Sequence, residues 1–143
     1  MIVIDASLAA KFVIAEADTA TARHWFAALV EDVAAPDLIA IEVSQAIVRR
    51  VNMRDASVVA GRNALDEWQA ILRAGGITLL RTTLADVGSA AELAMTLGHP
   101  IKDCIYLVLA MAQDCELATC DVRFATKARA VYPAVKLLTD YGN

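Results

Sequence analysis

The stretch Ile2-Val3-Ile4-Asp5 begins with three β-branched residues and ends at an acid. A short, continuous apolar run of this kind is typical of a strand that is buried on both faces of a parallel sheet. A second apolar run, Leu117-Ala118-Thr119-Cys120, stands directly before Asp121. The two segments therefore predict two buried strands, each followed at once by an aspartate.

Strand and helix patterns alternate along the whole chain, which predicts a single α/β domain over residues 1–143 with a parallel sheet covered on both faces. Strands are expected at 2–4, 33–35, 77–80, 117–120 and 135–138. Helices are expected at 7–14, 19–31, from 37 or 38 to 52, 56–73, from a cap at 83 to 97, from 102 or 103 to 113, and 122–131. Periodicity alone does not give the order of the strands.

The composition restricts the classes of function. Hydrophobic residues make up 58% of the 143 residues and charged residues 21%, which excludes a disordered chain and predicts that part of the apolar surface contacts another chain. The net charge of −4 excludes a generally basic nucleic-acid binder, so any contact with nucleic acid must be local. The chain has three cysteines, no signal-peptide pattern and no apolar run of membrane-spanning length, so we expect a cytoplasmic protein without membrane contact.

Four acids differ from the other acids in their surroundings: Asp5, Glu42, Asp103 and Asp121. Two follow strands, one opens a helix, and Glu42 lies among apolar helical residues. Ligands of open parallel sheets bind beyond the carboxyl ends of the strands, so these acids converge if the first and fourth strands are neighbours. Converging carboxylates repel one another, and a hard cation such as Mg²⁺, or Mn²⁺ as the alternative, offsets the repulsion. Phosphodiester hydrolysis is the chemistry that such a site supports.

Each acid also has a plainer interpretation. Asp5 and Asp103 can each be only a helix N-cap, Asp121 a turn residue, and Glu42 a side chain that points to solvent. Taken singly, these interpretations are somewhat more common than a metal ligand. The metal site gains support because all four acids lie where one edge of the sheet would collect them.

Four ordered motifs carry a resemblance to a known family. They occupy residues 3–16, 35–43, 103–110 and 117–124. As a set they resemble the PIN-domain ribonucleases, and the short single-domain architecture resembles the VapC-type toxins of bacterial toxin–antitoxin pairs. The resemblance implies a three-layer α/β/α fold with strand order 3-2-1-4-5.

The resemblance also implies a function. It makes Asp5, Glu42, Asp103 and Asp121 the acidic catalytic and metal site of a Mg²⁺-dependent endoribonuclease. It further implies that the enzyme is a toxin that forms a homodimer and is held inactive by a cognate antitoxin. Ser7 and Thr119 match hydroxyl positions near such a site, and a helix cap and a strand-end hydroxyl explain them equally well.

Three other functions remain to be compared with this one. The first is the same nuclease chemistry in RNA processing, without a toxin role. The second is a phospho-acceptor receiver domain, which requires paired acids directly after the first strand, where this chain has only Asp5. The third is an inactive PIN-like interaction module, which would be expected to lack some of the four acids.

Basic residues cluster in and after the helix that carries Glu42. Arg49, Arg50 and Arg54 form either a contact to the RNA backbone or an ordinary solvated helix face. His99 has no partner at metal-ligand spacing, and we interpret it as structural or exposed.

Overall fold

The computed structural model describes residues 1–142, which contain one five-stranded parallel sheet. The strands are β1 (Ile2–Ile4), β2 (Val33–Pro36), β3 (Thr78–Leu80), β4 (Glu116–Thr119) and β5 (Val135–Leu137). Their order is β3-β2-β1-β4-β5, which confirms the implied topology and makes β1 and β4 neighbours. A receiver domain has the order 2-1-3-4-5, so that alternative is wrong.

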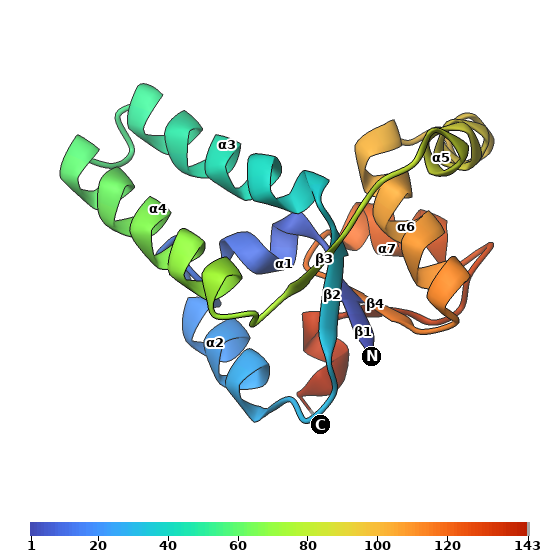
Figure 1. Cartoon of the computed structure of the whole chain (residues 1–143), viewed down its shortest axis with the longest axis horizontal. Helices are drawn as coiled ribbons and strands as arrows, with labels where there is room; N and C mark the ends of the chain where they lie inside the picture. Colours follow the sequence, from blue (N-terminus) through green and yellow to red (C-terminus); the bar gives the residue numbers. More distant parts are fainter. Residues whose placement is uncertain (143) are drawn as a thin grey trace.

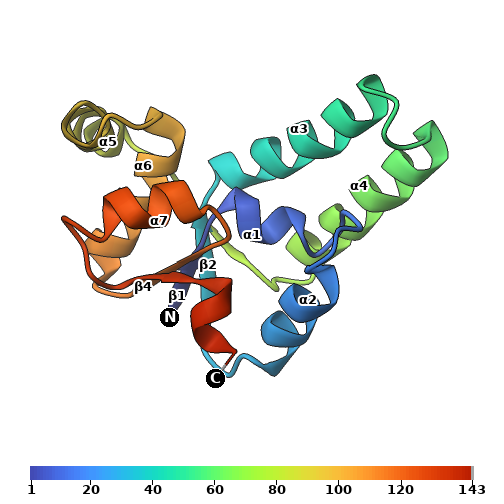
Figure 2. The same cartoon turned by 180° about the vertical axis from the view of Figure 1, so that it is seen from behind.

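Helices cover both faces of the sheet. Those on one face are α1 (Ala6–Ala10), α2 (Thr19–Ala28), α3 (Leu38–Asn52) and α4 (Val58–Arg73) (Figure 1). Those on the other face are α5 (Leu84–Leu97), α6 (Ile101–Gln113) and α7 (Val122–Ala128), as the reverse view also shows (Figure 2). Within residues 1–142 no single helix has the length and apolarity to cross a membrane, although α5 and α6, bent by 115°, together meet the composition test.

The central strand lies at the middle of the core. Ile2, Val3 and Ile4 are all buried, and β1 pairs with β2 on one side and β4 on the other. Because every strand runs in the same direction, the residues that follow β1 and β4 emerge at the same edge of the sheet. This edge is therefore where the segments carrying Asp5 and Asp121 meet.

Two predicted helix bounds differ from the structure for identifiable reasons. The first helix ends at Ala10 instead of reaching residue 14. Beyond it, the N–H groups of Phe12 and Val13 donate hydrogen bonds to carbonyls three residues back, as in a tighter 3₁₀ turn, and not four residues back as in an α-helix. The three consecutive apolar residues 12–14 are all buried, and a regular helix cannot turn three successive side chains to one side. α6 begins at Ile101, because Pro100 is its N-cap, where a missing N–H costs little.

The remaining bounds agree with the prediction or differ at their ends by one to three residues. The sequence patterns did not predict the short 3₁₀ helix η1 (Leu138–Tyr141), which follows β5. α3 covers Leu38–Asn52, as predicted, and it carries Glu42 on its second turn. The helix is therefore in register to present this acid at the edge where β1 ends.

Candidate functional site

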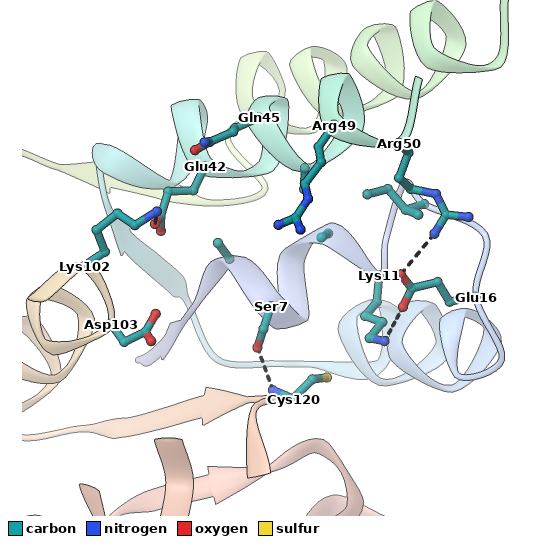
Figure 3. A pocket seen from close by; sticks show the side chains of 14 residues that line it. Ser7, Lys11, Glu16, Glu42, Gln45, Arg49, Arg50, Lys102, Asp103 and Cys120 are labelled. Carbon is teal, nitrogen blue, oxygen red and sulfur yellow. Dashed lines mark hydrogen bonds and ion pairs between the residues drawn. The ribbon is translucent and has the colours of Figure 1, made fainter. Parts of the chain in front are cut away.

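A cleft of about 480 Å³ opens at the carboxyl edge of the sheet, between α1, α3 and the start of α6. Figure 3 shows that Glu42, Lys102 and Asp103 lie at one end of it. The other end holds basic residues and Glu16, and Ser7 and Arg49 lie between the two ends (Figure 3). The cleft thus has an acidic end and a mainly basic end.

Asp5 is only 2% exposed and does not itself line this cleft, although the next two residues, Ala6 and Ser7, do. Its Oδ1 accepts hydrogen bonds from the Ser7 hydroxyl (2.7 Å) and from the Leu8 N–H (3.0 Å). Its Oδ2 accepts one from the Thr119 hydroxyl (2.5 Å). Asp5 is therefore the N-cap of α1, as its plainer interpretation held, and it is also tied to the end of β4.

Burial raises the pKa of Asp5 to about 6. The three hydrogen bonds oppose this increase because they stabilise the ionised carboxylate, and the negative charge of Asp103 adds a smaller increase.

The two predicted hydroxyls both lie at the site. The Ser7 hydroxyl accepts a hydrogen bond from the Cys120 N–H (3.0 Å) and lies 3.1 Å from the hydroxyl of Thr119. Thr119, which is fully buried, accepts a bond from the Asp121 N–H (3.0 Å). Ser7 is not the cap of its helix, since Asp5 fills that role. These hydroxyls therefore connect Asp5 to the backbone segment that carries Asp121.

Asp103, Asp121 and His99 form a compact group in which one candidate ligand atom from each residue lies within 4.8 Å of the others. Asp121 caps α7 through Oδ1, which accepts from the Phe124 N–H (2.8 Å). Asp103 caps no helix: it is the third residue of α6, and its Oδ2 lies 2.6 Å from Nε2 of His99. The N-cap interpretation of Asp103 is therefore wrong, and Asp121 has a defined capping role.

Glu42 points into the cleft, and its side chain is 10% exposed, so its interpretation as a solvent-directed side chain is wrong. The Tyr106 hydroxyl donates to its Oε2 (2.5 Å), and the Lys102 ammonium lies 3.3 Å from its Oε1. Burial, followed by the hydrogen bond to Glu42, raises the pKa of Tyr106 above its usual value. Tyr106 therefore stays protonated and acts as the donor.

The basic residues of the cleft differ in their pairing. Arg50 lies 3.3 Å from Glu16, and Lys11 contacts both Glu16 and Asp18. Arg49 also lines the cleft, but in the part of the chain that the structure describes it forms no ion pair. The structure therefore leaves Arg49 available for a ligand.

Arg54 lies in the turn after α3, in the left-handed backbone region (φ 60°), and does not line the cleft. The predicted cluster of arginines is thus divided, with Arg49 and Arg50 at the cleft and Arg54 outside it.

Sequence reasoning missed two residues of this site. His99 is interpreted above as having no partner, yet it contacts Asp103, and its side chain is only 5% exposed. The four-residue spacing of these two residues was not a usable signal, because His99 lies outside the helix, before its N-cap Pro100. Tyr106 was hidden within an apolar helix, where an aromatic residue normally indicates only core packing.

The fold and the cleft define a class of protein: an α/β domain with carboxylates gathered at the carboxyl edge of a parallel sheet. The family model of the PIN domain matches residues 2–130, and the chain belongs to the PIN domain family. Membership of this family supports nuclease activity. No curated protein sequence matches the chain.

Solved structures that are similar to it include the following two. VapC20 of Mycobacterium tuberculosis, a Sarcin-Ricin loop cleaving toxin, is 17% identical, with a TM-score of 0.74 over 88% of this chain and 94% of that one. A toxin-antitoxin complex from Klebsiella pneumoniae is 15% identical, with a TM-score of 0.64 over 96% of this chain and 98% of that one. At these identities the likeness shows a shared fold.

The pKa of Asp5 predicts how stability depends on pH. A carboxyl whose pKa rises from 3.8 to about 6 on folding adds stability that is complete below pH 3.8 and is lost as the pH rises through 6. Without divalent cations, the wild type should therefore gain about 1.4 kcal/mol from this group between pH 7.5 and pH 5. Asp5→Asn should lack this gain. Urea unfolding of both proteins in EDTA at the two pH values measures it, and equal changes with pH would contradict the shift.

Proposed function

We propose that this chain is a metal-dependent endoribonuclease that acts in the cytoplasm as the toxin of a toxin–antitoxin pair. One observation supports the proposal: Glu42 and Asp103 line a cleft with a basic end, Asp121 groups with Asp103, and Asp5 is hydrogen-bonded to Ser7, which also lines the cleft. The acidic site consists of Asp5, Glu42, Asp103 and Asp121.

The donor set fits a hard divalent cation. Within residues 1–142, Oδ1 of Asp103 and Oδ2 of Asp121 accept no hydrogen bond, so each carboxylate has an oxygen available for a ligand. Mg²⁺ typically takes one or two carboxylates and several waters, and Mn²⁺ accepts similar ligands. When bound, such a cation lowers the pKa of a coordinated water and neutralises charge on the leaving oxygen.

The other two acids are held from behind by donors of the chain itself. Asp5 is fixed by two hydroxyls and a backbone N–H, and only Oδ2 keeps a lone pair that accepts no hydrogen bond. Glu42 is fixed between Tyr106 and Lys102. These contacts orient the carboxylates before any ligand arrives, which reduces the cost of reorganisation during the reaction.

The basic end of the cleft fits the phosphate backbone of RNA. Arg49 is exposed and lines the cleft, and its guanidinium has the geometry for two hydrogen bonds to one phosphate. Lys11 and Arg50 are held by Glu16 and contribute less free charge. We therefore assign the main RNA contact to Arg49.

The toxin role and the protein partners rest on the similar structures and on the composition. VapC20 is a toxin, and the Klebsiella pneumoniae structure is a toxin-antitoxin complex. These relatives favour a toxin over a nuclease of RNA processing. We propose a cognate antitoxin as one partner and a second copy of this chain as the other, since large apolar side chains such as Leu84 (91% exposed) and Ile41 (68% exposed) remain uncovered.

The metal site is tested with Asp103→Asn, which removes one charge and keeps an oxygen that can accept from His99. In EDTA the variant should be at least as stable as the wild type, because one repulsion is lost. At a Mg²⁺ concentration a hundredfold above Kd, the wild type should gain about 2.7 kcal/mol. The variant should gain little, and it should not cleave RNA.

Thermal melts in EDTA and in Mg²⁺, together with an RNA cleavage assay, measure these effects. Asp66→Asn is the matched control, since it removes the same charge from an exposed position on α4. Equal Mg²⁺ stabilisation of Asp103→Asn and the wild type, with cleavage retained, would falsify the metal site. Sequencing of RNA 5′ ends after brief expression of the wild type would identify the substrate.

The RNA contact is tested with Arg49→Ala, with Arg54→Ala as the control outside the cleft. Both changes are made in the Asp103→Asn protein so that the RNA stays intact. Arg49→Ala should weaken RNA binding and reduce the slope of log K against log salt by about 0.7, the value for one phosphate contact on a single strand. Fluorescence anisotropy over a salt series measures the slope, and equal slopes for both variants would show that Arg49 only faces solvent.

The partners are tested by light scattering and activity on the same samples. Alone, the chain should have the mass of a dimer at tens of micromolar. With the product of a small reading frame directly upstream, it should form a complex that does not cleave RNA even in excess Mg²⁺, because a basic side chain of the partner can occupy the carboxylates. Full cleavage by the stoichiometric complex would rule out this mode of inhibition.

A further inference from the structure

We propose that His99 is a positioning residue that sets the orientation of the Asp103 carboxylate for the bound cation. This inference rests on the proposed function and deepens it. His99 lies in the turn between α5 and α6, directly before the N-cap Pro100. It is one of three residues whose candidate ligand atoms lie within 4.8 Å of one another, and the other two are Asp103 and Asp121.

The contact between His99 and Asp103 defines which atoms remain for a ligand. Nε2 of His99 lies 2.6 Å from Oδ2 of Asp103. A carboxylate can only accept, so Nε2 carries the proton and has no lone pair for a cation. The bond occupies Oδ2 and leaves Oδ1 available. A donor behind a ligating carboxylate fixes its orientation and tunes its affinity for the metal.

Several segments fix the imidazole itself. The ring stacks on Phe124 of α7, with centroids 4.9 Å apart and an interplanar angle of 26°. The backbone N–H of His99 bonds to the Ala94 carbonyl of α5 (3.0 Å), after Gly98 has turned the chain through a left-handed conformation (φ 59°). Lys127 of α7 donates to the Gly98 carbonyl (2.6 Å). The turn is thus held by α5 and α7 while it supports a residue of α6.

Two other roles for His99 make different predictions. If the ring served only for packing on Phe124, a phenylalanine in its place would serve equally well. If His99 were a direct ligand, a bound metal ion would show coupling to an imidazole nitrogen. The positioning role requires the N–H donor and excludes nitrogen coordination.

The experiment uses Mn²⁺ as the probe, with binding followed by electron paramagnetic resonance. His99→Phe keeps an aromatic ring and loses the donor, so Mn²⁺ affinity should fall about 10- to 100-fold. His99→Gln keeps an N–H donor and should restore the affinity to within a few-fold of the wild type. His24→Phe, at the other histidine of the chain, exposed on α2, is the control and should bind as the wild type does.

Melts in EDTA confirm that each variant is folded, and His99→Leu replaces His99→Phe if the latter is not. Wild-type affinity in the folded donor-free variant would overturn the positioning role and leave the metal site intact. Nitrogen coupling in pulsed spectra of Mn²⁺ bound to the wild type would also overturn it, in favour of direct ligation. If the wild type binds no Mn²⁺, the metal site of the proposed function is contradicted, and the positioning role is contradicted with it. The two failures are therefore distinguishable by whether the wild type binds Mn²⁺.

Discussion

The rest of the site depends on the hydrogen bonds of one buried carboxylate, that of Asp5 at the end of the central strand. It accepts three hydrogen bonds, which join the end of β1 to the first turn of α1 and to the last residue of β4. The neighbouring hydroxyls extend this connection to the backbone N–H groups of Cys120 and Asp121. One charged group therefore fixes the relative positions of two strand ends and of the helices that follow them.

Burying a charged carboxylate costs free energy of folding, and the raised pKa of Asp5 reflects this cost. The chain limits the cost by giving each of the four acids a donor of its own. Asp5 accepts hydrogen bonds from two hydroxyls, and Glu42 contacts the phenol of Tyr106 and the ammonium of Lys102. Asp103 contacts the imidazole of His99, and Asp121 accepts from a backbone N–H. These donors offset part of the mutual repulsion while oxygens of Asp103 and Asp121 remain available. The arrangement is thus compatible both with folding and with binding a cation.

The sequence predicts the parts of this structure that follow from local patterns. The apolar runs locate β1 and β4, and the rule for strand ends in parallel sheets locates Asp5 and Asp121, although the strand order itself came from the resemblance to a family. The contacts of His99 and Tyr106 were not predictable in this way. They depend on a left-handed turn at Gly98 and on a buried phenol that meets a helix 64 residues away in sequence. Neither periodicity nor composition carries that information.

The division of the cleft allows a chain of net charge −4 to present a local positive charge to an anionic ligand. Charges on a protein surface are screened over about 8 Å at physiological salt, so the local arrangement decides what approaches the cleft. Glu16 and Asp18 together balance Lys11 and Arg50 at one end, and Lys102 partly neutralises Glu42 at the other. Within residues 1–142, the guanidinium of Arg49 forms no ion pair on one side, and Asp103 and Asp121 each keep a carboxylate oxygen that accepts no hydrogen bond on the other. Under the proposed function, an anionic phosphodiester is attracted by Arg49 and repelled by the acids, so a metal ion held at the acids would remove that repulsion.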